Sequence, residues 1–134
     1  MAADRLTRSE AEWRSRLTPE QYHVAREHGT EPAFTGAYWN TKTPGQYLCV
    51  GCGQALFDAA AKYDSGTGWP SFWQALAPGR LELTEDTRYG MRRVEVACAR
   101  CGSHLGHLFE DGPRPTGQRY CMNSASLRLQ ATDR

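Results

Sequence analysis

Two short cysteine pairs constrain the fold of this chain more than any other feature of its sequence. They are Cys49 with Cys52, in CVGC, and Cys98 with Cys101, in CARC. A glycine follows each pair at once, which suits a tight knuckle whose backbone amides turn toward the sulfurs. Four thiolates brought together in this way form a tetrahedral cage that favours zinc, with iron as the lesser option.

The distance between the two pairs bears on how such a cage forms. The 45 residues between Cys52 and Cys98 exceed the spacing of a compact zinc ribbon, so the fold must bring the knuckles together. Two disulfides are a competing interpretation, but they would call for a secretory signal; a redox C-x-x-C motif would need only one copy. We therefore predict one structural Zn²⁺ ion per chain, bound by Cys49, Cys52, Cys98 and Cys101.

The fifth cysteine, Cys121, is left over once four are assigned to the metal. A nearby cation or imidazolium lowers the pKa of a thiol, and Arg119 with either His104 or His107 is available for this. Asn123 lies two residues further on and points to the same face as Cys121 if the segment is a strand. Cys121 is therefore a candidate reactive thiol, and the alternative is a buried structural cysteine.

Length and charge exclude several classes of protein. A chain of 134 residues supports one sizeable core. Its net charge of +1 provides no field to attract nucleic acid or an anionic membrane, so we expect neither partner. The first residues, MAADRLTRSE, carry charge where a signal peptide needs an apolar core, and no apolar run has the length of a membrane span. We expect a cytoplasmic protein, and a monomer.

Residues 1–32 are expected to form a helical N-terminal segment. Two capping boxes start its helices, one formed by Ser9 with Glu12 and the other by Thr18 with Gln21. Proline stands at the first position of the second helix, and Gly29 is the expected stop. The inward contacts are expected to be Trp13, Leu17, Tyr22 and Val24.

After an irregular aromatic and glycine-rich crossing over residues 33–47, the pattern is mainly that of strands. QYLCV, ALFDA, RLELTED, MRRVEVACA, HLGHLFED and YCMNSASLRL are the expected strands, with a hairpin turning over residues 87–90. In RVEVA, Val94 and Val96 are predicted to face inward and Arg93 and Glu95 to face water. The sequence thus predicts an antiparallel, mainly β fold in which zinc joins two knuckles.

Four aromatic residues share residues 62–76, KYDSGTGWPSFWQAL, with two glycines and a proline. Glycine and proline favour a loop, so Trp69 is expected at the surface of a pocket. The alternative is that all four aromatic side chains are core residues under a loop, which is the interpretation favoured for Phe72.

The segments SGTGWPSFW, CVGC, CARC, HLGHLFEDGPRPTG and RYCMNSASL together resemble the methionine sulfoxide reductase B family, which reduces the R epimer of methionine sulfoxide. The resemblance runs over residues 34–129. It implies a pair of antiparallel sheets with short helices outside. It also implies a single methionine-R-sulfoxide reductase domain over residues 1–134, with a catalytic β core over residues 33–130.

The resemblance also implies roles for individual residues. Cys121 would be the catalytic nucleophile, and the four paired cysteines would bind structural zinc. The sulfoxide pocket would be shaped by Trp69, His104, His107 and Asn123. The substrates would be oxidised proteins.

The chemistry of a sulfoxide suits these residue types. A selective pocket needs an aromatic wall for the methyl group, which Trp69 offers, and donors for the oxygen, which His107 and Asn123 offer. We expect the Cys121 thiolate to attack the sulfoxide sulfur while a protonated histidine, His107 in preference to His104, delivers a proton to the oxygen. Methionine then leaves, and Cys121 becomes a sulfenic acid.

One residue departs from the pattern of many family members. Thr67 stands where those members carry a second cysteine, which would resolve the sulfenic acid as an intramolecular disulfide. We therefore predict direct reduction by an external thiol, either thioredoxin or a small thiol such as glutathione. A zinc ligand acting as the resolving thiol is a weaker possibility, because the attack would cost the protein its metal.

Two other classes of function stay open at this point. A zinc-stabilised β module that binds a protein partner would catalyse nothing, and fold alone does not decide between the two. Such a module has no need for the thiol at position 121, between a cation and an amide. A catalytic metal is the other alternative, but four cysteine ligands leave no open coordination position.

Overall fold

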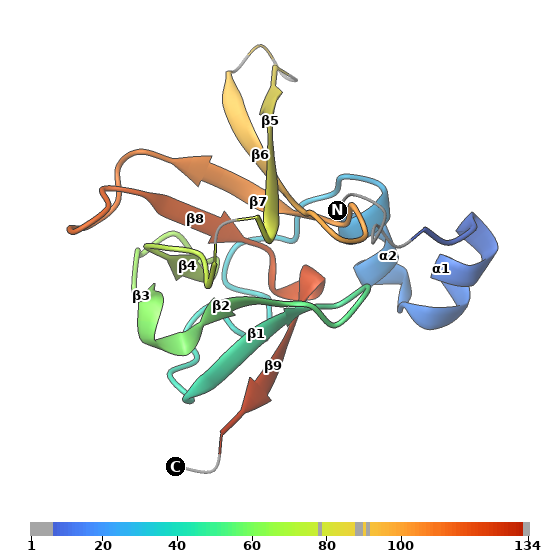
Figure 1. Cartoon of the computed structure of the whole chain (residues 1–134), viewed down its shortest axis with the longest axis horizontal. Coiled ribbons are helices and arrows are strands. Elements are labelled where there is room, and N and C mark those ends of the chain that lie inside the picture. The colour runs from blue at the N-terminus through green and yellow to red at the C-terminus, as the bar shows by residue number, and fades with distance from the viewer. Residues whose placement is uncertain (1–6, 78, 88–89, 91, 133–134) are drawn as a thin grey trace.

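A computed structural model describes residues 7–77, 79–87, 90 and 92–132 of the chain. Two antiparallel sheets face each other, and two short helices lie together at one end of the molecule (Figure 1). The helices are α1 (Glu10–Arg16) and α2 (Pro19–Arg26). Within the described residues, neither these nor any other helix has the length and apolar character that a membrane span requires.

Capping side chains define where both helices begin. Ser9 caps α1 in a complete capping box with Glu12, and Thr18 caps α2 in a second with Gln21, as predicted. Helix α2 ends at Arg26, and the left-handed backbone that follows belongs to His28, not to the expected Gly29. The imidazole of His28 lies 3.2 Å from the Glu95 carboxylate, a contact that the prediction of a simple glycine stop did not include.

The smaller sheet takes the first two strands and the last strand of the chain, and the larger sheet takes the six strands between them. The smaller sheet has the order β2-β1-β9, and the larger has the order β3-β4-β8-β7-β6-β5. Every pairing between neighbouring strands is antiparallel. The strand bounds are β1 (Gly45–Cys49), β2 (Ala55–Asp58), β3 (Lys62–Tyr63), β4 (Ser71–Phe72), β5 (Leu81–Asp86), β6 (Arg93–Cys98), β7 (His104–Phe109), β8 (Arg119–Met122) and β9 (Leu127–Ala131). The prediction of a mainly β fold with two antiparallel sheets is confirmed.

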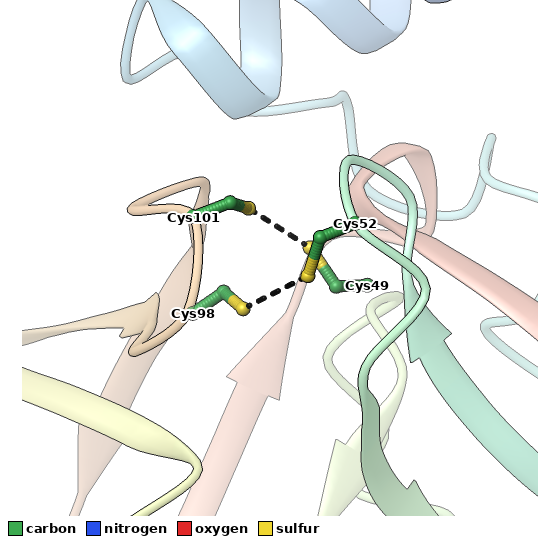
Figure 2. Close-up of side chains that lie close together, drawn as sticks. All are labelled: Cys49, Cys52, Cys98 and Cys101. Atoms are coloured by element: carbon green, nitrogen blue, oxygen red, sulfur yellow. Dashed lines mark hydrogen bonds between the residues drawn. The ribbon is translucent and has the colours of Figure 1, made fainter. Parts of the chain in front are cut away.

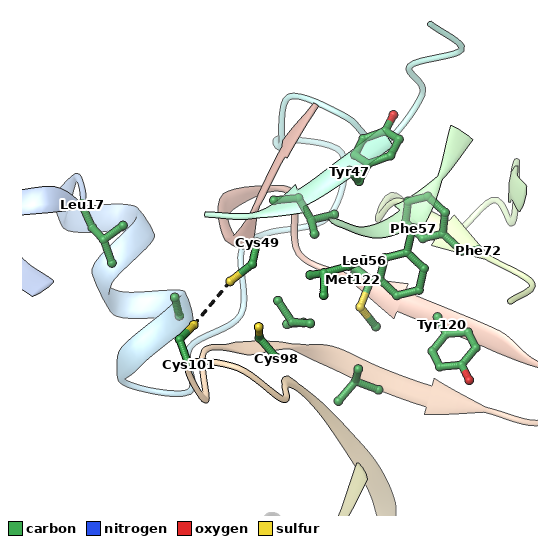
Figure 3. Close-up of a cluster of buried hydrophobic side chains, with 14 of the residues drawn as sticks. Leu17, Tyr47, Cys49, Leu56, Phe57, Phe72, Cys98, Cys101, Tyr120 and Met122 are labelled. Atoms are coloured by element: carbon green, nitrogen blue, oxygen red, sulfur yellow. Dashed lines mark hydrogen bonds between the residues drawn. The ribbon is translucent and has the colours of Figure 1, made fainter. Parts of the chain in front are cut away.

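The hydrophobic core fills the space between the sheets and reaches the helices (Figure 3). Phe57 and Phe72 stack with ring centroids 4.4 Å apart, and Tyr47 meets Phe72 edge to face at 5.2 Å. The expected inward residues of the helical segment, Trp13, Leu17, Tyr22 and Val24, are all buried. The core side of the larger sheet includes Val96, Leu105 and Met122.

Two expected elements differ from the observed ones. YCMNSASLRL is not one strand, because the chain leaves β8 after Met122, makes a 3-10 turn over Ser124–Ser126 and enters the other sheet as β9. The segment over residues 62–76 is not only a loop, since it contains the short strands β3 and β4. The expected hairpin turn over residues 87–90 lies partly outside the described residues.

The prediction that Arg93 and Glu95 face water was wrong. Their side chains are only 23% and 14% exposed. Glu95 lies directly opposite His107 on β7, and His107 lies directly opposite Cys121 on β8. The face of the larger sheet that points away from the core therefore carries polar side chains that bond to one another and line a pocket, and simple alternation along one strand could not reveal this.

Candidate active site

A pocket of about 250 Å³ opens on the polar face of the larger sheet. Cys121 lies in this pocket, which receives side chains from β6, β7 and β8 and from the loop before β4. Its lining consists of Thr30, Thr67, Trp69, Arg93, Gly106, His107, Phe109, Arg119, Cys121 and Asn123. Of the residues predicted to form the site, only His104 is missing from this lining.

Strand register brings the thiol and the imidazole together. Cys121 on β8 is paired with His107 on β7 on one side and with Ser71 on β4 on the other. Residues directly opposite in an antiparallel pair point to the same face, with Cβ atoms about 4.5–5.5 Å apart. The Cys121 thiol and the His107 imidazole therefore lie side by side on paired strands.

Burial dominates the electrostatics of Cys121. It raises the pKa of the thiol, while the charge of Arg119 and hydrogen bonds from Thr67 and Arg119 act to lower it. The Arg119 guanidinium is also bound to Asp111 through two hydrogen bonds of 2.8 and 3.1 Å. It lies 4.4 Å above the Phe109 ring as well. Arg119 is thus a fixed cation beside the thiol, but part of its charge is neutralised by Asp111.

His107 is held by a carboxylate from the edge strand of the sheet. Its Nε2 donates to Oδ2 of Asp86 over 2.8 Å, and Arg93 approaches the same oxygen at 3.5 Å. Burial lowers the pKa of His107, and the hydrogen bond to Asp86 acts against this by raising it. Neither Asp86 nor Arg93 was predicted as a site residue.

His104 lies behind His107 and does not line the pocket. Its ring centroid is 5.5 Å from that of His107, and its Nδ1 lies 2.7 Å from Oε2 of Glu95. Burial lowers the pKa of His104, and the hydrogen bond with Glu95 opposes this. The sequence predicted a direct contact between His104 and the substrate, but His104 is not among the residues that line this pocket.

Trp69 and Asn123 meet at a residue that sequence reasoning missed. The residue is Glu31. Its backbone carbonyl accepts a hydrogen bond from Nε1 of Trp69 at 2.9 Å, and its backbone N–H donates one to Oδ1 of Asn123 at 3.0 Å. Its side chain, which is buried, accepts from the N–H of Ala125 at 2.8 Å. The amide of Asn123 also donates to the carbonyl of Leu105 at 3.1 Å. Two sides of the pocket are thus joined through one segment from the start of the chain.

The four paired cysteines form a separate cluster at the ends of β1 and β6 (Figure 2). Sγ of Cys49 lies 3.5 Å from that of Cys101, and Sγ of Cys52 lies 3.6 Å from that of Cys98. All four sulfurs lie within 4.8 Å of one another, and none of these cysteines is in a disulfide.

The geometry of this cluster suits a tetrahedral metal ion. Zinc–sulfur bonds of about 2.3 Å place neighbouring sulfurs about 3.8 Å apart, close to the distances observed. Polar groups stand around the sulfurs: the N–H of Gly51 at 3.4 Å from Cys49, the Gln54 amide at 3.5 Å from Cys98 and the Ser103 hydroxyl at 3.1 Å from Cys101. Such outer donors hold thiolate ligands in place.

Comparison with known proteins agrees with this arrangement. The model of the SelR domain matches residues 17–131. A peptide methionine sulfoxide reductase MsrB from Methanosarcina mazei is 57% identical over 127 residues, which cover 95% of this chain and 91% of the relative. The MsrB of Acinetobacter baylyi is 52% identical over 130 residues, covering 97% of this chain and 94% of that protein.

A plant relative extends the comparison. The chloroplastic peptide methionine sulfoxide reductase B1 of Arabidopsis thaliana is 56% identical over 126 residues, covering 94% of this chain and 62% of the relative. Each of these three matches covers more than nine tenths of this chain. The chain therefore belongs to the SelR domain family, that of the methionine sulfoxide reductases B.

Proposed function

We propose that this protein is a peptide methionine sulfoxide reductase that reduces the R epimer of methionine sulfoxide in oxidised proteins, with Cys121 as the nucleophile. The observation that carries the proposal is the register that pairs Cys121 with His107 inside a pocket walled by Trp69. The relatives are peptide methionine sulfoxide reductases by name, which supports methionine sulfoxide as the substrate. The R preference rests on family membership.

The lining of the pocket suits a methyl sulfoxide. The Trp69 ring offers a flat apolar wall for the methyl group, and its indole is fixed by the bond to Glu31. Oxygen requires donors, which His107 supplies directly. Asn123 has one amide hydrogen bound to Leu105 and a second available on the same nitrogen.

The chemical step transfers one oxygen atom. The Cys121 thiolate attacks the sulfoxide sulfur, and His107 donates its proton to the oxygen as the sulfur–oxygen bond of the substrate breaks. The substrate sulfur gains two electrons and leaves as methionine. The bond between the two sulfurs breaks as the oxygen passes to the Cys121 sulfur, which loses two electrons and ends as a sulfenic acid.

Regeneration needs an external thiol. Thr67 lies in the pocket lining beside Cys121, so no cysteine stands there to resolve the sulfenic acid. Met122 packs into the core that includes Cys49, Cys98 and Cys101. Because side chains alternate along β8, Cys121 points away from that core. A first thiol, from thioredoxin or a small molecule, forms a mixed disulfide with release of water, and a second thiol frees Cys121.

The four-cysteine cluster is proposed to hold structural Zn²⁺, which would not take part in the reaction. With all four positions filled by sulfur, the ion has no site for water or substrate. Its effect would be to join the ends of β1 and β6, which belong to different sheets.

Replacing Cys121 by serine tests the proposal. Turnover of an R-sulfoxide peptide with a dithiol reductant should fall to background, because serine is a far weaker nucleophile at this site. Replacing Cys52 by serine is the matched control, since it removes a cysteine that has no place in the reaction; this variant should lose metal binding but react at Cys121 while it stays folded. If Cys121→Ser still turns over the R-sulfoxide peptide, the mechanism is wrong.

A further inference from the structure

The His107 ring bonds to the carboxylate of Asp86, and the guanidinium of Arg93 lies against the same carboxylate. We propose that Asp86 is a positioning residue: it binds Nε2 of His107 and so leaves Nδ1 to donate the proton to the sulfoxide oxygen. Arg93, which approaches the same carboxylate, opposes the effect of Asp86 on His107. This inference deepens the proposed function and rests on it.

The contact between Asp86 and His107 spans three strands of the larger sheet. Asp86 ends β5, Arg93 lies opposite it on β6, and His107 comes from β7 beyond. The Asp86 side chain is only 3% exposed, and that of His107 only 10%. The bond of 2.8 Å between Nε2 and Oδ2 is therefore shielded from water and cannot be exchanged freely for a solvent contact.

This bond determines which nitrogen of His107 takes part in catalysis. A carboxylate accepts hydrogen bonds and donates none, so Nε2 of His107 carries the hydrogen in the bond. The exchangeable proton of the imidazolium is then the one on Nδ1. Among the described residues Nδ1 has no hydrogen-bond partner, and the ring lines the pocket that holds Cys121. The proton would pass from Nδ1 to the sulfoxide oxygen, leaving the neutral Nε2–H form.

Charges around His107 act in opposite directions. Asp86 faces it from β5, Arg93 and Glu95 from β6, and His104 lies on its own strand. On the remaining side β8 contributes Cys121 and Arg119. After burial, which lowers the pKa of His107, the hydrogen bond to Asp86 raises it and the charge of Arg93 lowers it. Asp86 therefore increases the protonated fraction of His107, and Arg93 decreases it.

The experiment follows the ring nitrogens of His107 by NMR in the zinc-loaded protein. Long-range proton–nitrogen spectra of ¹⁵N-histidine protein, recorded over a pH series, report both the tautomer and the pKa. The wild type should show the Nε2–H form when neutral. Asp86→Asn should lower the pKa of His107, and Arg93→Gln should raise it. Glu85→Gln, an exposed change on the same strand, should leave both observables as in the wild type.

Activity gives a second readout in the same variants. The single-turnover rate of methionine formation should fall by between about tenfold and a hundredfold in Asp86→Asn, less than the loss of a whole general acid. A merely structural role would lower the rate without changing the tautomer, and would not make the two variants shift the pKa in opposite directions. If His107→Asn retains full activity, the acid role in the proposed function fails, whereas the NMR result still decides the role of Asp86.

Three results would overturn the inference. The first is an Nδ1–H tautomer of His107 in the wild type. The second is a tautomer and pKa of His107 that do not change in Asp86→Asn, and the third is a His107 pKa that falls in Arg93→Gln. Should Asp86→Asn not fold, Arg93→Gln decides alone, because the proposal requires the pKa of His107 to rise when that cation is removed.

Discussion

At the scale of single residues, Cys121 is less acidic than its neighbours in the sequence suggest. Arg119 precedes it by two residues, and the sequence alone favours a lowered pKa. Burial of the thiol raises its pKa by more than Arg119 lowers it, and Asp111 neutralises part of the charge of Arg119. We therefore expect Cys121 to be mainly a thiol at neutral pH, with the thiolate as a minor form.

Alkylation of Cys121 over a pH series tests this. A raised pKa means that the thiolate fraction grows as pH increases toward that pKa, so the rate with iodoacetamide should have a midpoint above the ordinary 9.0. Arg119→Met should move the midpoint higher and Asp111→Asn lower, since the first charge lowers the pKa and the second raises it. Peptide mass spectrometry identifies the modified cysteine. A midpoint near neutral pH would show that burial does not dominate.

The sequence allowed some site residues to be predicted and left others hidden, for a physical reason. Cys121, Trp69 and Asn123 stand in compact motifs whose chemistry is apparent locally. Glu31 contacts Asn123 across 92 residues of chain, and nothing in its own surroundings marks that contact. Asp86 reaches His107 only because β5, β6 and β7 pair in one register. Partners of this kind become visible when the strands are assembled.

At the scale of elements, the pairing of β7 with β8 places the Cys121 thiol beside the His107 imidazole. Gly106 lies next to His107 on β7, and an added Cβ there would come within 2.0 Å of the carbonyl oxygen of Cys121 and 2.8 Å of Cα of Met122. The two strands can approach each other closely because position 106 has no side chain. The distance between thiol and imidazole thus depends on this glycine.

Gly106→Ala should push β7 away from β8. We expect a loss of about 1–3 kcal/mol in the free energy of unfolding, because the contact is with backbone and neither strand can yield without breaking its pairing. Turnover should fall by roughly a hundredfold, since a displacement of about 1 Å between reacting groups has an effect of that order. Urea denaturation and the single-turnover rate measure the two quantities. Wild-type stability and rate in this variant would contradict the role given to the close approach.

Elements were predicted best where local signals act. Both capping boxes begin their helices as the sequence indicated, because side-chain caps depend on residues three positions apart. The break between β8 and β9 was not predicted, although Asn123 and the two serines that follow it are residue types that favour turns. The chain turns there because Asn123 and Ser126 bond to the Leu105 carbonyl on the neighbouring strand, a partner outside the local pattern.

At the scale of the whole molecule, the cysteine cluster joins the two sheets. Cys49 ends β1 of the smaller sheet and Cys52 follows it, while Cys98 ends β6 of the larger sheet and Cys101 follows it. Helix α2 lies against the same region, where Arg26 donates to the carbonyl of Cys101 at 2.9 Å. The sequence predicted the cluster but not which elements it would connect, because this depends on the order of strands in both sheets.

Loss of the metal should therefore lower the stability of the whole fold. The reaction at Cys121 should persist only while the two sheets stay packed. We expect one zinc per chain, and a drop of several kcal/mol in stability in Cys98→Ser, because the free energy of metal binding contributes to folding. Elemental analysis and thermal unfolding measure these effects. Cys121→Ser is the control and should keep both the zinc and the melting temperature. A Cys98→Ser protein as stable as the wild type would exclude this structural role.

A single-turnover assay tests the central claim, that Cys121 takes the oxygen from the R sulfoxide and that no second cysteine resolves it. Reduced, zinc-loaded protein is mixed with each epimer of a methionine sulfoxide peptide, without reductant and with a sulfenic acid trap. We predict one methionine per chain from the R epimer, none from the S epimer, and the trap on Cys121 alone. No methionine from either epimer, or a disulfide between Cys121 and another cysteine in place of the trapped species, would contradict the account.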